Sequence, residues 1–173
     1  VIKVEPPDVG DEARRAGPFV GDDPHPEKSL TFFYLNSNKR SVTLNLESAA
    51  GRNILKSLVK KADALIESYP PGYMDELGLG YQALEKINPQ LVMTSITPFG
   101  QTGPYRDAPG NDLIYEAMGG IMYVSGAYDR EPLKHGQPQS LYIGGVTAAY
   151  ATSVALFART FLGQGQPVDL SLR

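Results

Sequence analysis

The 173-residue sequence contains no cysteine, which excludes disulfides, thiolate catalysis and cysteine-bound metals. It also lacks a P-loop, a zinc-type histidine motif and a Gly-x-Ser-x-Gly elbow, so we expect neither a metal nor a prosthetic group. The sixteen basic and nineteen acidic residues show no basic run, and we expect no nucleic acid as a partner. No signal peptide is visible, and our expectation is a cytoplasmic protein.

One segment could be considered for membrane insertion: residues 136–158 carry no formal charge, and the segment is long enough to span a bilayer. The segment also contains glutamine, serine, threonine, tyrosine and several glycines, which are poorly suited to lipid. We interpret it as a buried helix of small residues over 142–161 and expect no membrane partner.

Apolar periodicity divides the chain into alternating strands and helices. The pattern predicts strands at 1–5, 42–46, 64–67, 91–97 and 168–173. It predicts helices at 48–62, 73–77, 81–87 and 142–161, and leaves 31–35 ambiguous. A polar loop separates the first strand from residue 29, and Ser48 or Asn45 is the expected helix cap. This alternation favours an α/β fold with a mainly parallel sheet and flanking helices.

The stretch 93–105 begins as an apolar strand and opens into a loop that contains Gly100 and Gly103. Open α/β sheets bind ligands where parallel strands end in such loops. The two glycines allow close backbone approach, and Phe99 and Tyr105 offer flat apolar faces. The stretch therefore predicts a ligand-binding loop, with an ordinary strand-to-helix connection as the alternative.

The sequence resembles the class III CoA-transferases (CaiB/BaiF type), the family of formyl-CoA and carnitine CoA-transferases, to which α-methylacyl-CoA racemases also belong. The motifs that carry this resemblance follow one another in order along nearly the whole chain. They are residues 1–7, Gly10-Asp11, Leu35-Asn36, 38–42, 63–67, Pro71-Gly72, 77–81, Asn88-Pro89, 95–105 and 163–169.

The resemblance implies a Rossmann-like core that binds coenzyme A. Residues 1–173 are then an incomplete CoA-binding α/β domain, which lacks the first strand and the C-terminal half of the family pattern. Family members form interlocked homodimers, and both halves of the sequence are needed for that assembly. We therefore expect a fragment that is inactive by itself.

Coenzyme A is implied as a substrate, and its phosphates need basic or backbone partners. The resemblance implies contacts from the turn after the strand at 64–67, from the loop after the strand at 91–97, and from a few basic side chains. These residues are Arg15, Lys39, Arg40, Ser68, Tyr69, Pro71, Gly72, Thr97, Phe99, Gly100, Gln101 and Gly103. The alternative is solvated basic side chains and two structural turns.

The family reaction transfers CoA between an acyl-CoA and a carboxylic acid through an anhydride and a thioester on an enzyme carboxylate. In the family pattern, the nucleophilic Asp or Glu comes five residues after the position of Asp169, which is immediately after Arg173. No catalytic residue is therefore expected within the chain. Asp169 itself is interpreted as a structural carboxylate.

Two other functions stay open. One is a non-catalytic acyl-CoA-binding module. The other is a racemase, which needs a histidine at the position of Asn111 and an aspartate that aligns with Ser140; neither residue present accepts a proton at neutral pH. His25 and His135 are isolated in sequence, and we interpret each as a solvated loop histidine.

Overall fold

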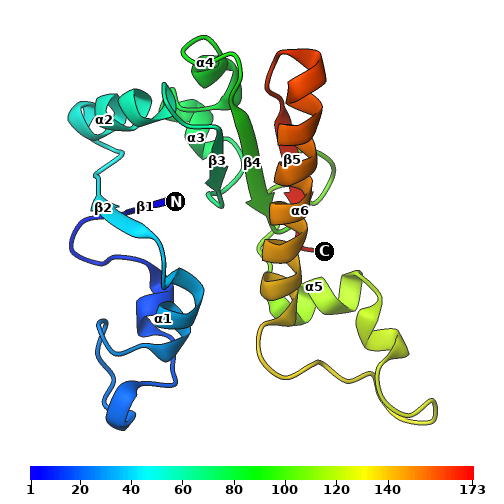
Figure 1. The fold of residues 1–173 in the computed structure, drawn as a ribbon. Coiled ribbons are helices and arrows are strands. Elements are labelled where there is room, and N and C mark those ends of the chain that lie inside the picture. Colours follow the sequence, from blue (N-terminus) through cyan, green and yellow to red (C-terminus); the bar gives the residue numbers. More distant parts are fainter. The chain divides into compact units, whose positions relative to one another are not determined.

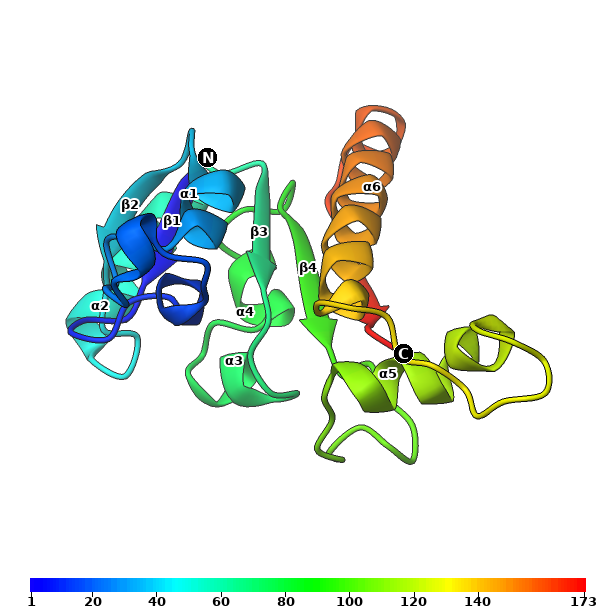
Figure 2. The same cartoon turned by 90° about the horizontal axis from the view of Figure 1, so that it is seen from below.

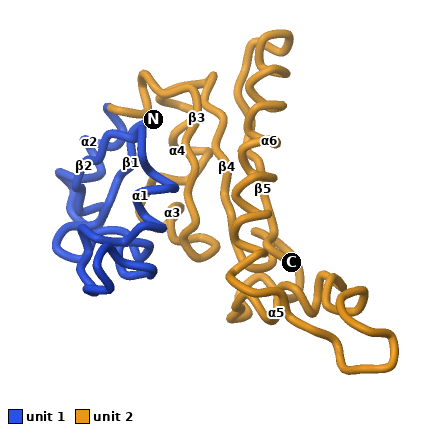
Figure 3. Tube along the Cα trace, turned by 60° about the horizontal axis from the view of Figure 1, so that its bottom comes forward, with its two compact units in different colours: residues 1–57 blue, residues 58–173 orange.

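The computed structural model describes all residues from Val1 to Arg173. The chain divides into two compact units, Val1–Ser57 and Leu58–Arg173 (Figure 3). Each unit contains its own parallel sheet, one of two strands and one of three, with helices between the strands (Figure 1). The α/β fold with parallel strands and flanking helices is thus confirmed, and the strands form two sheets.

In the first unit, β1 (Ile2–Glu5) pairs in parallel with β2 (Arg40–Thr43). Between them lie two short 3-10 turns, η1 (Glu12–Arg15) and η2 (Val20–Asp22), and the helix α1 (Leu30–Asn36). The ambiguous run 31–35 is therefore helical, because the Ser29 hydroxyl accepts a hydrogen bond from Phe32 N–H and caps α1.

The strand predicted at 42–46 is wrong in its bounds. β2 begins at Arg40, and Leu44 and Leu46 are buried after the strand has ended. The alternation that predicted the strand thus reflects inward-facing leucines in the connection to α2 (Ala49–Val59). Ser48 caps this helix, since its hydroxyl accepts a hydrogen bond from Gly51 N–H.

The second unit is built on β3 (Ala64–Glu67), β4 (Val92–Thr97) and β5 (Pro167–Ser171), in the order β3-β4-β5. The short helices α3 (Tyr73–Glu76) and α4 (Tyr81–Glu85) connect β3 to β4. After β4 come α5 (Asp112–Met118), η3 (Ile121–Val124) and the long α6 (Gln139–Leu162), as Figure 2 shows. Apart from the bounds of β2, the predicted strands and helices match these elements to within a few residues.

Helix α6 packs against β4 and β5 through a stripe of small residues. The buried members of this stripe are Ser140, Gly144, Ala148, Thr152 and Ala155. A Cβ at Gly144 would lie 2.4 Å from a methyl carbon of Leu172, so glycine permits the close approach of α6 to the residue that follows β5. The hydroxyls of Thr152 and Thr94 share a buried hydrogen bond of 2.7 Å.

The prediction that this helix is buried holds for one face only. Tyr150, Phe157 and Phe161 are exposed on α6, together with several aliphatic side chains. The helix is long and apolar enough to cross a bilayer by length and composition, with 22% of its most apolar window buried. Its small residues do cover a sheet, as expected for a helix of a folded α/β unit.

Candidate functional site

Three polar side chains line up across the carboxyl edge of the three-stranded sheet. The strand register places Glu67 of β3 beside Ser95 of β4, and Ser95 beside Asp169 of β5. Side chains alternate between the two faces of a strand, so this row lies opposite Thr94 and hence away from α6. With Gly72, Gln101 and others, the row borders a hollow of about 420 Å³.

The two carboxylates in this row hold the two predicted ligand loops. Glu67 accepts a hydrogen bond of 2.7 Å from Tyr69 N–H, and Asp169 accepts one of 2.9 Å from Gln101 N–H. Burial raises the pKa of Glu67, and its hydrogen bonds with Ser95 and Tyr69 oppose that rise. Each loop is therefore fixed to the end of a strand by a carboxylate, which is a structural role for Asp169.

The turn 68–72 presents mixed surfaces. Ser68 is exposed, and the exposed ring of Tyr69 lies 5.0 Å from that of Tyr73. Pro71 is half-buried, and Gly72 precedes α3 with a φ of 89°, a backbone conformation that favours glycine. The turn thus offers an exposed aromatic face at Tyr69, which suits stacking with an aromatic ligand ring.

The loop 97–103 is buried at its start and open further on. Thr97 is 1% exposed, and its hydroxyl has no hydrogen-bond partner. Phe99 packs between Tyr105 and Tyr115, with ring centroids 5.9 Å from each. Gly100 is buried close to the Asp169 carboxylate, whereas Gln101 is half-buried and Gly103 is exposed. Of this predicted set, the segment from Gln101 to Gly103 is the most accessible to a ligand.

The predicted basic contacts belong to the first unit. Lys39 Nζ donates a hydrogen bond to Asn36 Oδ1, and Arg15 Nη1 donates one to Val9 O. Arg40 is exposed and forms part of β2, rather than preceding the strand as expected. These three side chains are accessible to solvent, and their coenzyme role stays a prediction.

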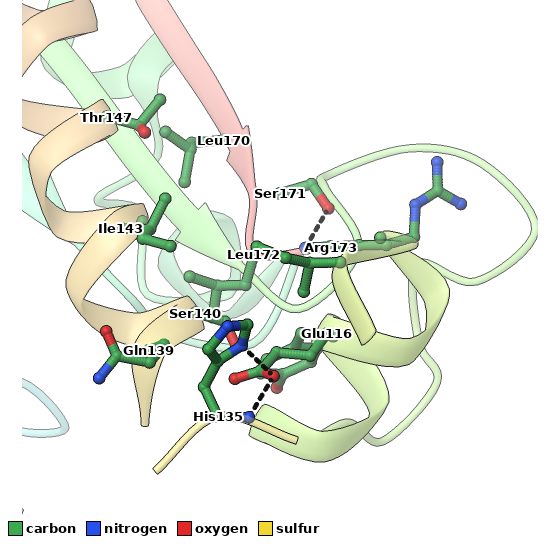
Figure 4. A pocket seen from close by; sticks show the side chains of 14 residues that line it. Glu116, His135, Gln139, Ser140, Ile143, Thr147, Leu170, Ser171, Leu172 and Arg173 are labelled. Carbon is green, nitrogen blue, oxygen red and sulfur yellow. Dashed lines mark hydrogen bonds and ion pairs between the residues drawn. The ribbon is translucent and has the colours of Figure 1, made fainter. Parts of the chain in front are cut away.

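A second cavity of about 430 Å³ lies where α5, α6 and the end of β5 meet (Figure 4). Its walls are mainly apolar and include Tyr115, Ile143, Leu170 and Leu172, with Ser140 at the start of α6. The residues that follow β5 also line it, so the chain end at Arg173 borders this cavity. The predicted nucleophile after Arg173 lies beyond the sequence and stays a prediction.

A buried carboxylate, Glu116 of α5, lines this cavity and is 3% exposed. Its Oε2 accepts two hydrogen bonds from His135, one from the backbone N–H at 3.0 Å and one from Nδ1 at 3.1 Å. Figure 4 shows the two side chains facing one another. The hydrogen bond from the His135 backbone is the main cause that lowers the pKa of Glu116. Glu116 is thus an anion at neutral pH.

The other carboxylate oxygen, Glu116 Oε1, is buried and has no hydrogen-bond partner. Lys134 lies nearby, with Nζ 3.9 Å from Oε1, but its ammonium donates to His135 O and Gln137 O and pairs with Asp112. An ammonium has three N–H donors, so none is left for Glu116. A buried acceptor without a donor beside an apolar cavity is suited to contact a ligand or a reacting carbon atom.

Sequence reasoning did not select Glu116, whereas its interpretation of His135 as a solvated loop histidine is confirmed. The His135 side chain is 43% exposed, and it also contacts the buried Glu116. His25 is exposed, as expected. A charged residue within the apolar helical run 113–118 was the available signal, although it did not reveal the distant histidine.

The two positions that bear on racemization have structural roles. Asn111 caps α5, since its Oδ1 accepts a hydrogen bond of 3.1 Å from Ile114 N–H. Ser140 N–H donates to Asp112 Oδ1 at 2.9 Å. Neither residue supplies a base, so these two positions give no support to proton abstraction.

Loops at the ends of parallel strands and an apolar cavity with a few polar groups are where α/β proteins commonly bind organic ligands. Over residues 1–173 the sequence matches the family described as CoA-transferase family III. The chain therefore belongs to CoA-transferase family III.

Individual relatives agree with this assignment. The chain is 40% identical over 171 residues to succinyl-CoA:(R)-benzylsuccinate CoA-transferase subunit BbsE of Thauera aromatica, covering 99% of this chain and 42% of that protein. It is 43% identical over 172 residues to acetyl-CoA:oxalate CoA-transferase of Acetobacter aceti, and this match covers 99% of this chain and 43% of that protein. The crystal structure of a CAIB/BAIF family protein from Brucella suis superposes on this chain with a TM-score of 0.88 at 42% identity. The match covers 99% of this chain and 45% of that protein. The chain thus spans less than half the length of these relatives.

Proposed function

We propose that the full-length protein transfers CoA from an acyl-CoA to a free carboxylic acid. The observation that carries this proposal is the match to CoA-transferase family III over every residue of the chain. The relative from Acetobacter aceti is named as a transferase between acetyl-CoA and oxalate, which is a reaction of this type. Acyl-CoA and a carboxylic acid are accordingly the proposed substrates.

The proposed chemistry begins when a carboxylate oxygen bonds to the thioester carbonyl carbon. The C–S bond breaks, CoA leaves as a thiolate, and a mixed anhydride remains on the enzyme. The thiolate then attacks the enzyme-side carbonyl, which releases the donor acid and leaves an enzyme thioester. The acceptor acid reverses these steps and leaves as the new acyl-CoA. An apolar cavity favours this sequence because it limits hydrolysis of the anhydride.

Glu116 has the properties that a carboxylate nucleophile needs: His135 anchors one oxygen, and the other oxygen has no donor. The resemblance instead predicts the nucleophile immediately after Arg173, and Arg173 itself lines the cavity of Glu116. A nucleophile at Glu116 and one after Arg173 would catalyse the same reaction. The two are distinguished by which carboxylate becomes acylated.

A second candidate function is a non-catalytic acyl-CoA-binding subunit. The relative from Thauera aromatica is named as a subunit of its enzyme. In that case, the chain would bind acyl-CoA and a different chain would supply the carboxylate.

The assembly implied by the resemblance, an interlocked homodimer, is also part of the proposal. The exposed aromatic residues Tyr150, Phe157 and Phe161 on α6 support it, because apolar side chains of this size are commonly covered in an assembled protein. Light scattering of the full-length protein at the mass of a dimer is the expected result, and a stable monomer would contradict it.

The test combines an exchange assay with mapping of the acyl-enzyme. The full-length protein is incubated with a panel of acyl-CoA donors and isotope-labelled acids, quenched with hydroxylamine, and digested for mass spectrometry. We expect label in the acyl-CoA pool and a hydroxamate on one carboxylate, either Glu116 or the residue after Arg173. Coenzyme binding without any exchange or hydroxamate would support the non-catalytic subunit. Absence of both binding and exchange would overturn the proposal.

A further inference from the structure

Arg106 lies between the two predicted coenzyme loops, although the sequence analysis did not select it. Its Nε donates a hydrogen bond of 2.9 Å to Gln101 O, in the loop after β4. Its Nη2 lies 2.9 Å from the position that a Cβ at Gly72 would occupy, in the turn after β3. One guanidinium therefore contacts both loops at the carboxyl edge of the three-stranded sheet.

The Gln101 backbone fixes this guanidinium to the sheet. The N–H of Gln101 donates to the Asp169 carboxylate of β5, and the carbonyl of the same residue accepts from Arg106 Nε. Gly100 makes the approach possible, because its φ of 88° is a conformation that glycine adopts without strain. Arg106 is thus held by a defined hydrogen-bond path from β5 rather than being a free surface side chain.

Most of the donors on Arg106 have no protein acceptor. A guanidinium carries five N–H groups. One donates to Gln101 O, and one on Nη1 donates to Asp107 Oδ1 at 2.7 Å. The ion pair with Asp107 is weak, because that carboxylate belongs to the neighbouring residue and is 77% exposed. The Arg106 side chain is itself 36% exposed, so an anion from solvent can reach the remaining donors.

The nearby carboxylates do not occupy these donors. Glu67 is engaged by Tyr69 N–H and Asp169 by Gln101 N–H. A planar fork of N–H donors with a fixed orientation is suited to bidentate binding of phosphate. Coenzyme A carries phosphate at two places, the diphosphate bridge and the 3′-position of the ribose.

We propose that Arg106, placed by the Asp169–Gln101 hydrogen-bond path and by the absence of a side chain at Gly72, binds a phosphate group of coenzyme A. This inference rests on the proposed function, because it assumes that the ligand of the two loops is an acyl-CoA. It assigns the phosphate contact to a side chain of the second unit, independently of Lys39, Arg40 and Arg15 in the first unit.

The test uses the full-length protein with Arg106→Gln and Arg106→Lys. The matched control is Arg130→Gln, an exposed arginine whose side chain makes no hydrogen bond or ion pair. The acyl thioesters of CoA, dephospho-CoA and pantetheine are compared as donors. For acyl-CoA, we expect Arg106→Gln to raise KM or Kd by about 10- to 100-fold with kcat little changed, as for loss of a charge-assisted contact. Lysine restores part of the loss, and the control stays at the wild-type value.

The truncated donors identify the phosphate. With the pantetheine thioester, which lacks all these phosphates, wild type and Arg106→Gln have the same KM. If the penalty persists with dephospho-CoA, Arg106 binds the diphosphate; if the penalty disappears, it binds the 3′-phosphate. An equal penalty with all three donors, or no penalty with acyl-CoA, overturns the inference.

A second variant keeps the arginine and moves it. Gly72→Ala would place a Cβ 2.9 Å from Arg106 Nη2, so we expect the same donor-dependent rise in KM.

Failure of the inference is distinct from failure of the proposed function. If the wild type binds acyl-CoA and the Arg106 variants match it, only the inference fails; if the wild type binds no acyl-CoA, the proposed function fails first.

Discussion

Two buried glutamates, one in each unit, differ in how their oxygens are satisfied. Glu5 in β1 is 4% exposed, and it accepts hydrogen bonds from Arg14 Nε, Arg14 Nη2, Ser41 Oγ and Asp11 N–H. Glu116 in α5 is 3% exposed, but only its Oε2 accepts hydrogen bonds. The two glutamates are thus equally buried, and they differ because only Glu116 has an oxygen without a hydrogen-bond partner and lines a cavity.

The first prediction concerns the structural member of the pair. Arg14→Ala leaves Glu5 buried without its main partner, and it also removes the guanidinium that lies 4.0 Å from the centre of the Phe32 ring. We expect a loss of about 3–5 kcal/mol in the free energy of unfolding, as for other buried pairs that lose one member. Urea denaturation of the full-length protein measures this loss.

The neighbouring arginine supplies the matched control. Arg15 is exposed and donates only to Val9 O, so Arg15→Ala changes stability by less than about 0.5 kcal/mol. Equal effects of the two alanine variants would show that Glu5 and Arg14 do not form the structural pair described here.

The second prediction uses acid to weaken the same pair. Hydrogen bonding to Arg14 lowers the pKa of Glu5 from 4.5 to about 2. A carboxyl whose pKa is lower in the folded state stabilises the fold above its unfolded pKa, and this contribution is lost as pH falls toward the folded pKa. We expect up to about 3 kcal/mol to be lost between pH 4.5 and 2.

Unfolding measured against pH in wild type and Glu5→Gln isolates that contribution. The wild type should lose more stability than the variant across this range, because the variant has no carboxyl at that position. Parallel curves would contradict the lowered pKa of Glu5.

The third and smallest predicted effect concerns Glu116. His135→Ala removes the imidazole from Glu116 Oε2 but keeps the backbone N–H, the larger cause of the lowered pKa of Glu116. The pKa of Glu116 therefore rises only slightly. If ionised Glu116 is needed for exchange, the acid limb of the kcat/KM profile moves to higher pH by the same amount.

The pH profile of exchange by His25→Ala is the control, since His25 is exposed in the first unit and contacts no carboxylate. If the acid limb of the kcat/KM profile is the same in His135→Ala as in the wild type, the imidazole does not influence the group whose titration controls exchange.

The sequence predicted most of what depends on local pattern. Apolar alternation located β1, β3 and β4, and the glycines of the two loops indicated where those strands end. The bounds of β2 were wrong because two buried leucines, Leu44 and Leu46, continue the alternation beyond the strand pairing. Periodicity reports which side chains face inward, and it does not report where hydrogen bonding between strands stops.

What could not be predicted depends on contacts between distant residues. Glu116 becomes significant only because the loop at His135 folds back onto α5 and because Lys134 is engaged elsewhere. Arg106 becomes significant only because Gly72, from another strand end, lies beside its guanidinium. The spacing of these residues in the sequence predicts neither the pairing of Glu116 with His135 nor that of Arg106 with Gly72. Both pairings become visible only in the folded structure.

The most direct test of the central claim measures exchange and stability together in Glu5→Gln and Glu116→Gln of the full-length protein. We predict a crossed result. With Glu116 as the nucleophile, Glu116→Gln lowers acyl-CoA:acid exchange by about 100-fold or more and leaves the unfolding midpoint nearly unchanged, whereas Glu5→Gln lowers the midpoint and keeps kcat. Full exchange activity in Glu116→Gln would contradict a role of Glu116 as the nucleophile and leave the position after Arg173.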